Sequence, residues 1–342
     1  MAAPVFEIPA ASPARIINIR ESAFAYDLFI TAVSNFDFFN RLAKSPADID
    51  TICGSLNIKK RPADVMLTLF KAYGFIKEKN KKFYLTDTAK TYLTKESGFD
   101  LTSYVSSIKD RPICKDIEKV LRTGRPANWA AAKDGKDWAA SMENDAFAAS
   151  FSAGMNSRGA YLAGGLVKAV GLKGYKKVLD IGGASGIYSA ALVKAFPNLR
   201  ATVFEKPPVD KVAKYSINKF GLSDRINVVA GDVFKDSLPN GHDVHFISHV
   251  LHDWDLPEVR TVLKNSHENL SPDGIIILHD AHVNKSKTGP LSVAEYSVLL
   301  MVLSEGKCYS FAEMKDLLEE VGFHDVEYRP TILNRSIVIG KK

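Results

Sequence analysis

The chain has 342 residues and a formal net charge of +6, and 46% of its residues are hydrophobic and 25% charged. These proportions are those of ordinary globular proteins and exclude a disordered or collagen-like chain. The length predicts two domains, at roughly 150 residues each, with enough chain to bury a large core.

Three features of the sequence bear on the cellular compartment. The cysteines Cys53, Cys114 and Cys308 are widely spaced and form no CxxC pair, which argues against a disulfide framework or a zinc cluster. Residues 1–20 lack the charged start and apolar run of a signal peptide. The longest apolar run near the C-terminus, 298–303, is far shorter than the roughly 20 residues that span a membrane. We therefore expect a cytoplasmic protein without a membrane partner.

The N-terminal part of the chain is predicted to be mostly helical. Apolar residues recur at helical spacing over 22–43, which predicts a buried helix. Ser45-Pro46 predicts the start of a second helix, and Pro62 the start of a third over 62–73. Two short strands around a Lys-Asn-Lys turn follow, an order typical of a winged helix-turn-helix. Residues 100–176 are again predicted to be mostly helical.

A basic patch coincides with this winged helix. Between Lys59 and Lys95 the chain carries ten basic and three acidic residues, so the remainder is nearly neutral. Such a patch raises the question of nucleic-acid binding. However, the helix that would read DNA, 62–73, is apolar nearly all round and contains one lysine. We expect it to be buried in a dimer interface, so the sequence favours a homodimer without a nucleic-acid partner over a DNA-binding regulator.

From Lys177 onward, apolar runs alternate with amphipathic segments. The runs are continuous, which is typical of buried parallel strands that carry helices on both faces. They are KVLDI (177–181), ATVFE (201–205), INVVA (226–230), VHFIS (244–248) and GIIILHD (274–280). This pattern predicts a doubly wound α/β domain.

Polar motifs follow these strands in order. The first strand contains Asp180 and leads into Gly182–Gly186, a tight turn that lets a ligand approach the backbone. A carboxylate before such a turn would repel a pyrophosphate but suits a ligand with an amino group and a sulfonium. Glu205 ends the second strand, where it can accept hydrogen bonds from both ribose hydroxyls. Residues 231–234 and 249–254 follow the next two strands, and the four motifs together favour a nucleoside-binding site.

The segments VLDIGGASG, FE, GDVF, LHDW, SPDG and EEVGF resemble the motifs of class I S-adenosylmethionine-dependent O-methyltransferases. The resemblance is to the small-molecule branch of caffeic-acid-type, hydroxyindole-type and bacterial antibiotic-tailoring enzymes, and it covers essentially the whole chain. It implies a Rossmann-like, doubly wound seven-stranded sheet with an N-terminal, mostly helical winged-helix domain. The implied domains are 1–105 for dimerisation, 106–170 as a helical linker that contributes to the acceptor pocket, and 171–342 for cofactor binding and catalysis. The implied reaction moves a methyl group from S-adenosylmethionine to a hydroxyl of a small aromatic molecule and leaves S-adenosylhomocysteine.

The resemblance also implies a cofactor site, residue by residue. Three kinds of contact are expected: with the methionine moiety, with the ribose and with the adenine. The residues implied are Asp180, Gly182, Gly183 and Gly186 for the first, Glu205 for the second, and Asp232, Val233 and Trp254 for the third, together with Ser248. Two positions depart from the family, because Ala184 stands for a usual glycine and Ser248 for a frequent lysine.

The catalytic prediction centres on His252. A phenol has a pKa of about 10, so its methylation gains from a general base near neutral pH, a task that suits histidine. The candidate catalytic residues are His252, Asp253 and Asp280: His252 matches the family's base, Asp253 follows it directly, and Asp280 matches a carboxylate that orients it. A second family carboxylate aligns with Cys308. Either Asp280 suffices, or Glu305 substitutes, or the acceptor chemistry differs, so C- or N-methylation or a non-methylating relative stays an alternative.

The acceptor pocket and the histidines complete the set of predictions. Phe151, Met155, Met301 and Cys308 are the candidate acceptor contacts, because methionine and aromatic side chains suit a planar apolar ligand, and Met155 matches an acceptor contact of the family.

Four histidines lie close together in the sequence, at 242, 245, 249 and 252. If this segment is a strand, His245 and His249 share a face but stand about 13 Å apart. We therefore expect no metal site.

Overall fold

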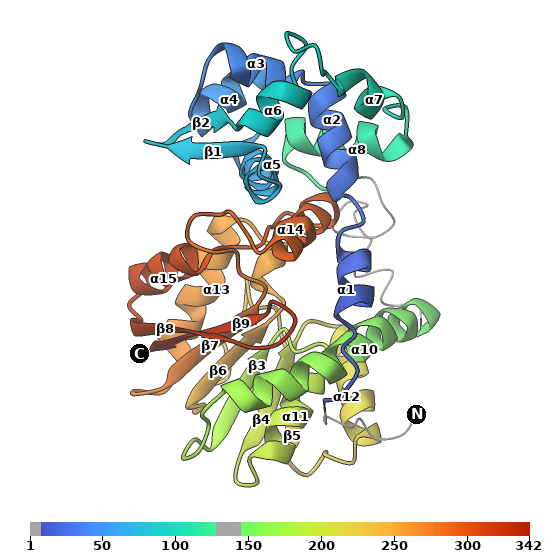
Figure 1. Cartoon of the computed structure of the whole chain (residues 1–342). Helices are drawn as coiled ribbons and strands as arrows, with labels where there is room; N and C mark the ends of the chain where they lie inside the picture. The colour runs from blue at the N-terminus through green and yellow to red at the C-terminus, as the bar shows by residue number, and fades with distance from the viewer. Residues whose placement is uncertain (1–7, 128–144) are drawn as a thin grey trace. The chain divides into compact units, whose positions relative to one another are not determined.

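The computed structural model describes residues 8–127 and 145–342, which form two compact units (Figure 1). The sheet unit comprises 8–12, 145–282 and 311–342, and the helical unit comprises 13–127 and 283–310. This division differs from the expected one. The expected linker is divided, with 106–127 in the helical unit and 145–170 in the sheet unit. Residues 8–12 belong to the sheet unit, and 283–310 leave the sheet to join the helical unit.

The sheet unit is built on seven strands in the order β5-β4-β3-β6-β7-β9-β8. The first five of these pair in parallel, and β9 runs antiparallel to both β7 and β8. The five apolar runs of the sequence are confirmed as strands, within one residue at their ends. The strands are β3 (Lys177–Ile181), β4 (Arg200–Glu205), β5 (Ile226–Ala230), β6 (Val244–Ser248), β7 (Ile275–Asp280), β8 (His324–Pro330) and β9 (Ser336–Lys341).

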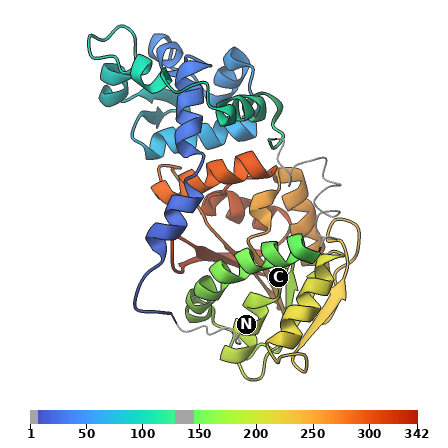
Figure 2. The same cartoon turned by 90° about the vertical axis from the view of Figure 1, so that its right-hand side faces the viewer.

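Helices cover both faces of this sheet. On one face α10 (Asp145–Ala169), α11 (Ile187–Ala195) and α12 (Val209–Lys219) contact one another, and α10 and α12 lie side by side in Figure 2. On the other face α13 (Leu256–Asn269) contacts α15 (Phe311–Glu320). Because crossovers between parallel strands are right-handed, this arrangement means that the chain winds outward in both directions from the centre of the sheet. The doubly wound α/β architecture is confirmed.

The helical unit combines helices with one antiparallel hairpin. Helix, helix and hairpin follow one another from α4 to β2, as a winged helix-turn-helix requires. The elements are α1 (Ala14–Glu21), α2 (Ala25–Ser34), α3 (Phe38–Lys44), α4 (Ile49–Leu56), α5 (Lys60–Ala72), β1 (Ile76–Lys79), β2 (Lys82–Leu85), α6 (Asp87–Tyr92), α7 (Thr102–Ser106), α8 (Pro112–Thr123) and α14 (Leu291–Leu303). Asn80 and Lys81 have φ values of 51° and 61°, as a two-residue hairpin turn with two left-handed positions requires.

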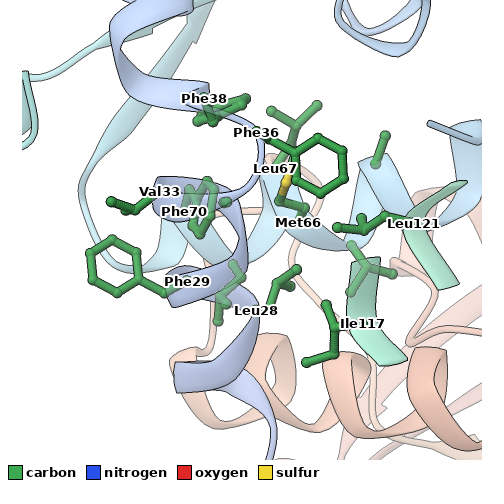
Figure 3. Close-up of a cluster of buried hydrophobic side chains, with 14 of the residues drawn as sticks. Leu28, Phe29, Val33, Phe36, Phe38, Met66, Leu67, Phe70, Ile117 and Leu121 are labelled. Carbon is green, nitrogen blue, oxygen red and sulfur yellow. The ribbon is translucent and has the colours of Figure 1, made fainter. Parts of the chain in front are cut away.

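Aliphatic and aromatic side chains together form the core of the helical unit, part of which is drawn in Figure 3. Phe29, Phe38, Phe39 and Phe70 are buried, and their ring centroids lie between 5.1 and 6.2 Å apart in tilted or edge-to-face contacts. Helix α14 is apolar on all sides and packs on α2, α5 and α8. A helix of that composition has to be buried, which explains why this stretch leaves the sheet unit.

Three local expectations need correction. The single helix expected over 22–43 is divided into α2 and α3, and Asp37, with φ 49°, precedes the second helix. Helix α4 begins at Ile49 rather than at Ser45-Pro46, because Asp48 caps it by accepting a 2.8 Å hydrogen bond from the Thr51 N–H. Helix α5 is buried by its own unit, so its apolar composition needs no dimer interface.

Asp64 on α5 holds the segment that contains α14. Its carboxylate lies 2.8 Å from Lys287 Nζ and 2.5 Å from Lys307 Nζ, and Arg61 donates a 2.6 Å hydrogen bond to the Gly306 carbonyl. Burial alone would raise the pKa of Asp64, but the two ammonium groups outweigh it and lower the pKa to about 2. These contacts fix the loop around Cys308 against α5.

Replacing Asp64 with asparagine is expected to lower the free energy of unfolding by about 2 kcal/mol at neutral pH, because two largely buried ammonium groups lose their counter-ion. Urea unfolding followed by circular dichroism measures this change. Asp50→Asn is the matched control. Asp50 pairs with Lys60 at 2.7 Å, but both side chains are mostly exposed, so the urea concentration at the midpoint of unfolding should not change. Equal midpoints for the two variants would contradict the prediction.

Candidate active site

The sequence motifs meet at the carboxyl ends of the central strands. β3 and β6 are neighbours in the sheet, although β4 and β5 lie between them in the chain (Figure 1). The connection after β3 runs toward one edge of the sheet and the connection after β6 toward the other. In open α/β sheets such a switch point opens a crevice that binds ligands. Residues 182–186 follow β3, and 249–254 follow β6.

The turn after β3 accepts only small residues. Gly182 and Gly186 have φ values of 70° and 73°. A Cβ on Gly183 would stand 2.6 Å from Cγ of Asp180, so the carboxylate and the turn fit together only without that carbon. Ala184 has φ 47°, a left-handed conformation that costs an alanine on the order of 1 kcal/mol.

Asp180 offers a buried oxygen to a ligand. The residue is 1% exposed, and its Oδ2 accepts a 2.6 Å hydrogen bond from the Ser189 hydroxyl. Among the residues that the structure describes, Oδ1 has no hydrogen-bond donor. Burial raises the pKa of this carboxyl to about 6. A buried acceptor without a donor suits a ligand that brings an amino group, which agrees with the role expected for Asp180.

Glu205 joins the end of β4 to the same turn. Its Oε2 accepts a hydrogen bond from the Ala184 N–H and its Oε1 one from the Lys206 N–H, both at 2.8 Å. Burial raises the pKa of Glu205 to about 7. Each carboxylate oxygen has a second lone pair, so both can still accept hydrogen bonds from a diol.

The segment after β5 lies beside the segment after β6. The Phe234 and Trp254 rings meet edge to face with centroids 4.7 Å apart. Asp232 accepts a 3.0 Å hydrogen bond from the Phe234 N–H and lies 3.3 Å from Lys206 Nζ. Burial opposes ionisation of Asp232, yet these partners hold its pKa below the usual value. Val233, which lies between Asp232 and Phe234 in the chain, is half-buried. The residues expected around an adenine therefore come together at the ends of β5 and β6.

His252 and Asp280 form the most polar contact of the site. His252 lies in the short helix η1 (Leu251–Asp253), is 4% exposed, and has its Nδ1 2.6 Å from Oδ1 of Asp280 at the end of β7. Since the carboxylate only accepts, Nδ1 carries the hydrogen and Nε2 is left as an acceptor. Burial would lower the pKa of His252, but the Asp280 carboxylate outweighs burial and raises it. Burial would raise the pKa of Asp280, but His252 outweighs burial and holds it well below the usual value. Asp253 Oδ1 is 3.8 Å from Nε2.

The strand expected to continue through the histidines stops earlier. β6 ends at Ser248, and His249 has φ 55°, so the chain turns there. The turn brings the His249 and His252 ring centroids to 5.5 Å, which the strand interpretation does not anticipate. Ser248, an expected cofactor contact, is buried and shares a 2.9 Å hydrogen bond with Nδ1 of His279.

Helix α10 contributes two polar residues that the sequence analysis does not identify. Asn156 Oδ1 accepts a hydrogen bond from the hydroxyl of Ser185 in the glycine-rich turn. The guanidinium of Arg158 is close enough to oppose the protonation of His252. The signal for both is the polar stretch within a helix of small and apolar residues. Met155, an expected acceptor contact, is half-buried and immediately precedes Asn156.

The other three acceptor candidates, Phe151, Met301 and Cys308, are not among the described side chains of the sheet unit. The side chain of Phe151 lies outside the described part of the chain. Met301 is fully buried in the core of the helical unit. Cys308, 4% exposed, belongs to the same unit and donates its N–H to Ser297 Oγ at 3.0 Å, and Glu305 is exposed there. Their contact with an acceptor stays a prediction.

None of the helices described within 8–127 and 145–342 combines the length and the apolar composition that a membrane crossing requires.

Comparisons with known proteins identify the family of the chain. Residues 115–324 match the model of the O-methyltransferase domain family. The chain is 29% identical over 299 residues to a 3-hydroxy-5-methyl-1-naphthoate 3-O-methyltransferase of Streptomyces sahachiroi, which covers 87% of this chain and 86% of the other. The structure is similar to that of an O-methyltransferase family 2 protein from Planctomyces limnophilus in complex with apigenin, with a TM-score of 0.88, 25% identity and both chains fully covered. It also has the fold of human N-acetylserotonin methyltransferase in complex with SAM, with a TM-score of 0.61 and 21% identity over 98% of this chain and 99% of that one.

Proposed function

Because the chain belongs to the O-methyltransferase domain family, it is an S-adenosylmethionine-dependent O-methyltransferase of small molecules, and we propose that it methylates an aromatic hydroxyl with His252 as the general base. The observation that carries the proposal is the 2.6 Å contact between His252 Nδ1 and Asp280, which leaves Nε2 free of its hydrogen at the carboxyl end of the sheet. The aromatic acceptor is supported by the naphthoate in the name of one relative and by the apigenin bound to one structural neighbour.

The residues around the glycine-rich turn fit the cofactor. Asp180 has a buried oxygen for the amino group, Glu205 has two oxygens for the ribose hydroxyls, and Asp232 lies next to Phe234 and Trp254, where an adenine would stack. When bound, S-adenosylmethionine supplies a methyl group on a sulfonium that needs no further activation. The chain therefore has to align the acceptor and make its oxygen nucleophilic.

His252 would do the second task. Its Nε2 would take the proton of the acceptor hydroxyl, which leaves the acceptor oxygen as a nucleophile for the methyl group that the bound cofactor would supply. The imidazolium that results would be stabilised by the buried carboxylate of Asp280, whose Oδ1 lies 2.6 Å from Nδ1. One oriented carboxylate is sufficient for this role, so the cysteine at position 308 is compatible with a working base.

A panel of hydroxylated, C-unsubstituted and amino-substituted aromatic acceptors tests the proposal. The purified protein is incubated with S-adenosylmethionine and each acceptor, and the methylated atom is assigned by mass spectrometry and NMR. Methyl ethers of phenols are the expected products. Methylation confined to carbon or nitrogen would overturn the assignment of an aromatic hydroxyl.

Binding of S-adenosylhomocysteine is expected to weaken about tenfold as the pH is lowered from about 8 to about 6. Burial raises the pKa of Glu205 to about 7, so the carboxylate that would accept the ribose hydroxyls is mostly ionised at the higher pH and mostly protonated at the lower. Isothermal titration calorimetry measures the two affinities. The Glu205→Gln variant should bind S-adenosylhomocysteine weakly at both pH values. At most a small dependence on pH should remain, from Asp180, whose pKa is about 6. An affinity independent of pH in the wild type would contradict the role given to Glu205.

We also propose that the protein works as a cytoplasmic homodimer that associates through its helical unit. Cys53, Cys114 and Cys308 form no disulfide with one another, which fits a reducing compartment. Large apolar side chains are exposed on the helical unit, which fits a surface that a second copy covers: Ile16, Ile19, Phe99 and Tyr104 are each between 65% and 77% exposed. Light scattering at micromolar concentration should give twice the mass of the chain, and a monomer would contradict the proposal.

A further inference from the structure

His249 is a buried imidazole for which the proposed methyl transfer has no task. Its side chain is 5% exposed, and within the described residues neither ring nitrogen has a hydrogen-bond partner. The ring is held in place by neighbouring rings, with centroids 5.2 Å from His279 and 6.1 Å from Tyr188. Buried polar groups in native proteins are nearly always satisfied, so two unpaired ring nitrogens call for a partner such as an ion.

The unpaired ring is directed at the same carboxylate oxygen that holds His252. His249 Nδ1 lies 3.5 Å from Asp280 Oδ1, which is too long for a well-formed hydrogen bond. One ligand atom from each of His249, His252 and Asp280 can be chosen so that all three lie within 4.8 Å of one another. In a tetrahedral zinc site, bonds of about 2.0–2.2 Å place the ligand atoms about 3.3 Å apart. The distance between His249 and Asp280 therefore already matches the spacing of two zinc ligands.

We propose that His249, His252 and Asp280 form a binding site for Zn²⁺ or a similar borderline divalent cation. Two imidazoles and one carboxylate, with a further position left for water, are the donor set that such ions prefer. The left-handed backbone at His249 makes the site possible, because it turns the chain at the end of β6 and brings two histidines three residues apart to one carboxylate.

Occupancy of this site inhibits methyl transfer. The His252 Nδ1 to Asp280 Oδ1 distance is 2.6 Å, too short to hold an ion between the two atoms. An ion bound by both atoms would separate them and replace the hydrogen on Nδ1, whereas an ion bound through Nε2 would occupy the accepting nitrogen itself. A neutral imidazole bound through Nδ1 carries its hydrogen on Nε2 and can no longer accept a proton there. The inhibition of methyl transfer rests on the proposed role of His252 as the base. The binding of the metal does not depend on that role.

Cobalt titration of the whole protein, after treatment with a chelator, tests binding without any need for activity. Co²⁺ replaces Zn²⁺ and gives visible absorption when its coordination is tetrahedral. His249→Asn keeps a residue that tolerates the left-handed backbone but removes the imidazole, and circular dichroism checks its fold. His324→Ala is the control, because His324 also lies 3.5 Å from a carboxylate, that of Asp325, but on the surface.

The wild type and His324→Ala should bind one equivalent of Co²⁺ with the same affinity, and excess Zn²⁺ should displace it. His249→Asn should bind at least about tenfold more weakly. Absence of the cobalt band in the wild type, or equal affinity of His249→Asn, would overturn the site. In the methyl-transfer assay, Zn²⁺ should inhibit the wild type at concentrations that leave the activity of His249→Asn unchanged relative to its own metal-free rate. Cobalt binding without zinc inhibition would uphold the site and overturn its link to the base.

Discussion

Replacing His252 with alanine is expected to lower kcat for phenolic acceptors by at least about 10²-fold. The imidazole is buried and carries its hydrogen on Nδ1 toward Asp280, so its removal takes away the proton acceptor at Nε2. Cofactor affinity should change little, since no contact with the cofactor is assigned to His252. Steady-state kinetics measures kcat, and calorimetry with S-adenosylhomocysteine measures the affinity.

Two variants and a pH profile separate a base from a structural residue. Asp280→Asn should cause a comparable loss, because an amide stabilises the imidazolium far less than a buried carboxylate does. Asp253→Asn is the matched control and should cost little, since its contact with His252 is 3.8 Å and its side chain is 47% exposed. Asp280 raises the pKa of His252, so kcat/KM should rise with pH through a value above 6.5, and the alanine variant should lose this rise. Near-normal turnover of that variant would instead indicate an acceptor that needs no deprotonation.

Replacing Asp180 with asparagine is expected to weaken S-adenosylhomocysteine binding by about 10²-fold, because a buried charged acceptor for the amino group is lost. The thermal midpoint of the ligand-free protein should stay the same or rise at pH 8. The reason is that burial raises the pKa of Asp180 to about 6, so its ionised form opposes folding above that pH and the amide does not. Calorimetry and thermal unfolding give the two readouts.

A second variant changes the same site by steric contact and leaves its charge unaltered. Gly183→Ala puts a carbon 2.6 Å from the Asp180 carboxyl and should also reduce affinity, by roughly 10-fold or more. Gly154→Ala on α10 is the control, since a Cβ there meets no atom within 4 Å. Loss of cofactor affinity in Asp180→Asn together with a lower thermal midpoint would indicate a structural role for Asp180 and contradict this account.

The sequence predicts the centre of the sheet unit well. Its parallel strands are buried on both faces, so each appears as a continuous apolar run with a polar motif at its carboxyl end, and parallel pairing then brings those ends together. The pairing of His252 with Asp280 follows from β6 and β7 being neighbours. The edge strand β8 has no such signal, because it is largely exposed and polar.

Other features depend on tertiary contacts that no local pattern encodes. Asn156 and Arg158 belong to a helix that precedes the sheet in the chain, and only the fold brings Asn156 to the glycine-rich turn. Helix α14 follows the last parallel strand but packs in the helical unit, since its apolar surface is covered by α2, α5 and α8. The left-handed turn at His249, directly after β6, has no signal in the sequence, because a histidine does not announce such a conformation. Because the chain turns there, the ring of His249 lies beside that of His252.

The most direct test of the central claim is the rate of methyl transfer to a series of phenols whose pKa values span the assay pH. A general base matters for a phenol that is protonated in solution and not for one that is already ionised. The account predicts that the deficit of His252→Ala is at least about 10²-fold for phenols of high pKa and shrinks toward none as the pKa falls below the assay pH. A deficit of the same size across the whole series would contradict a role for His252 in proton removal.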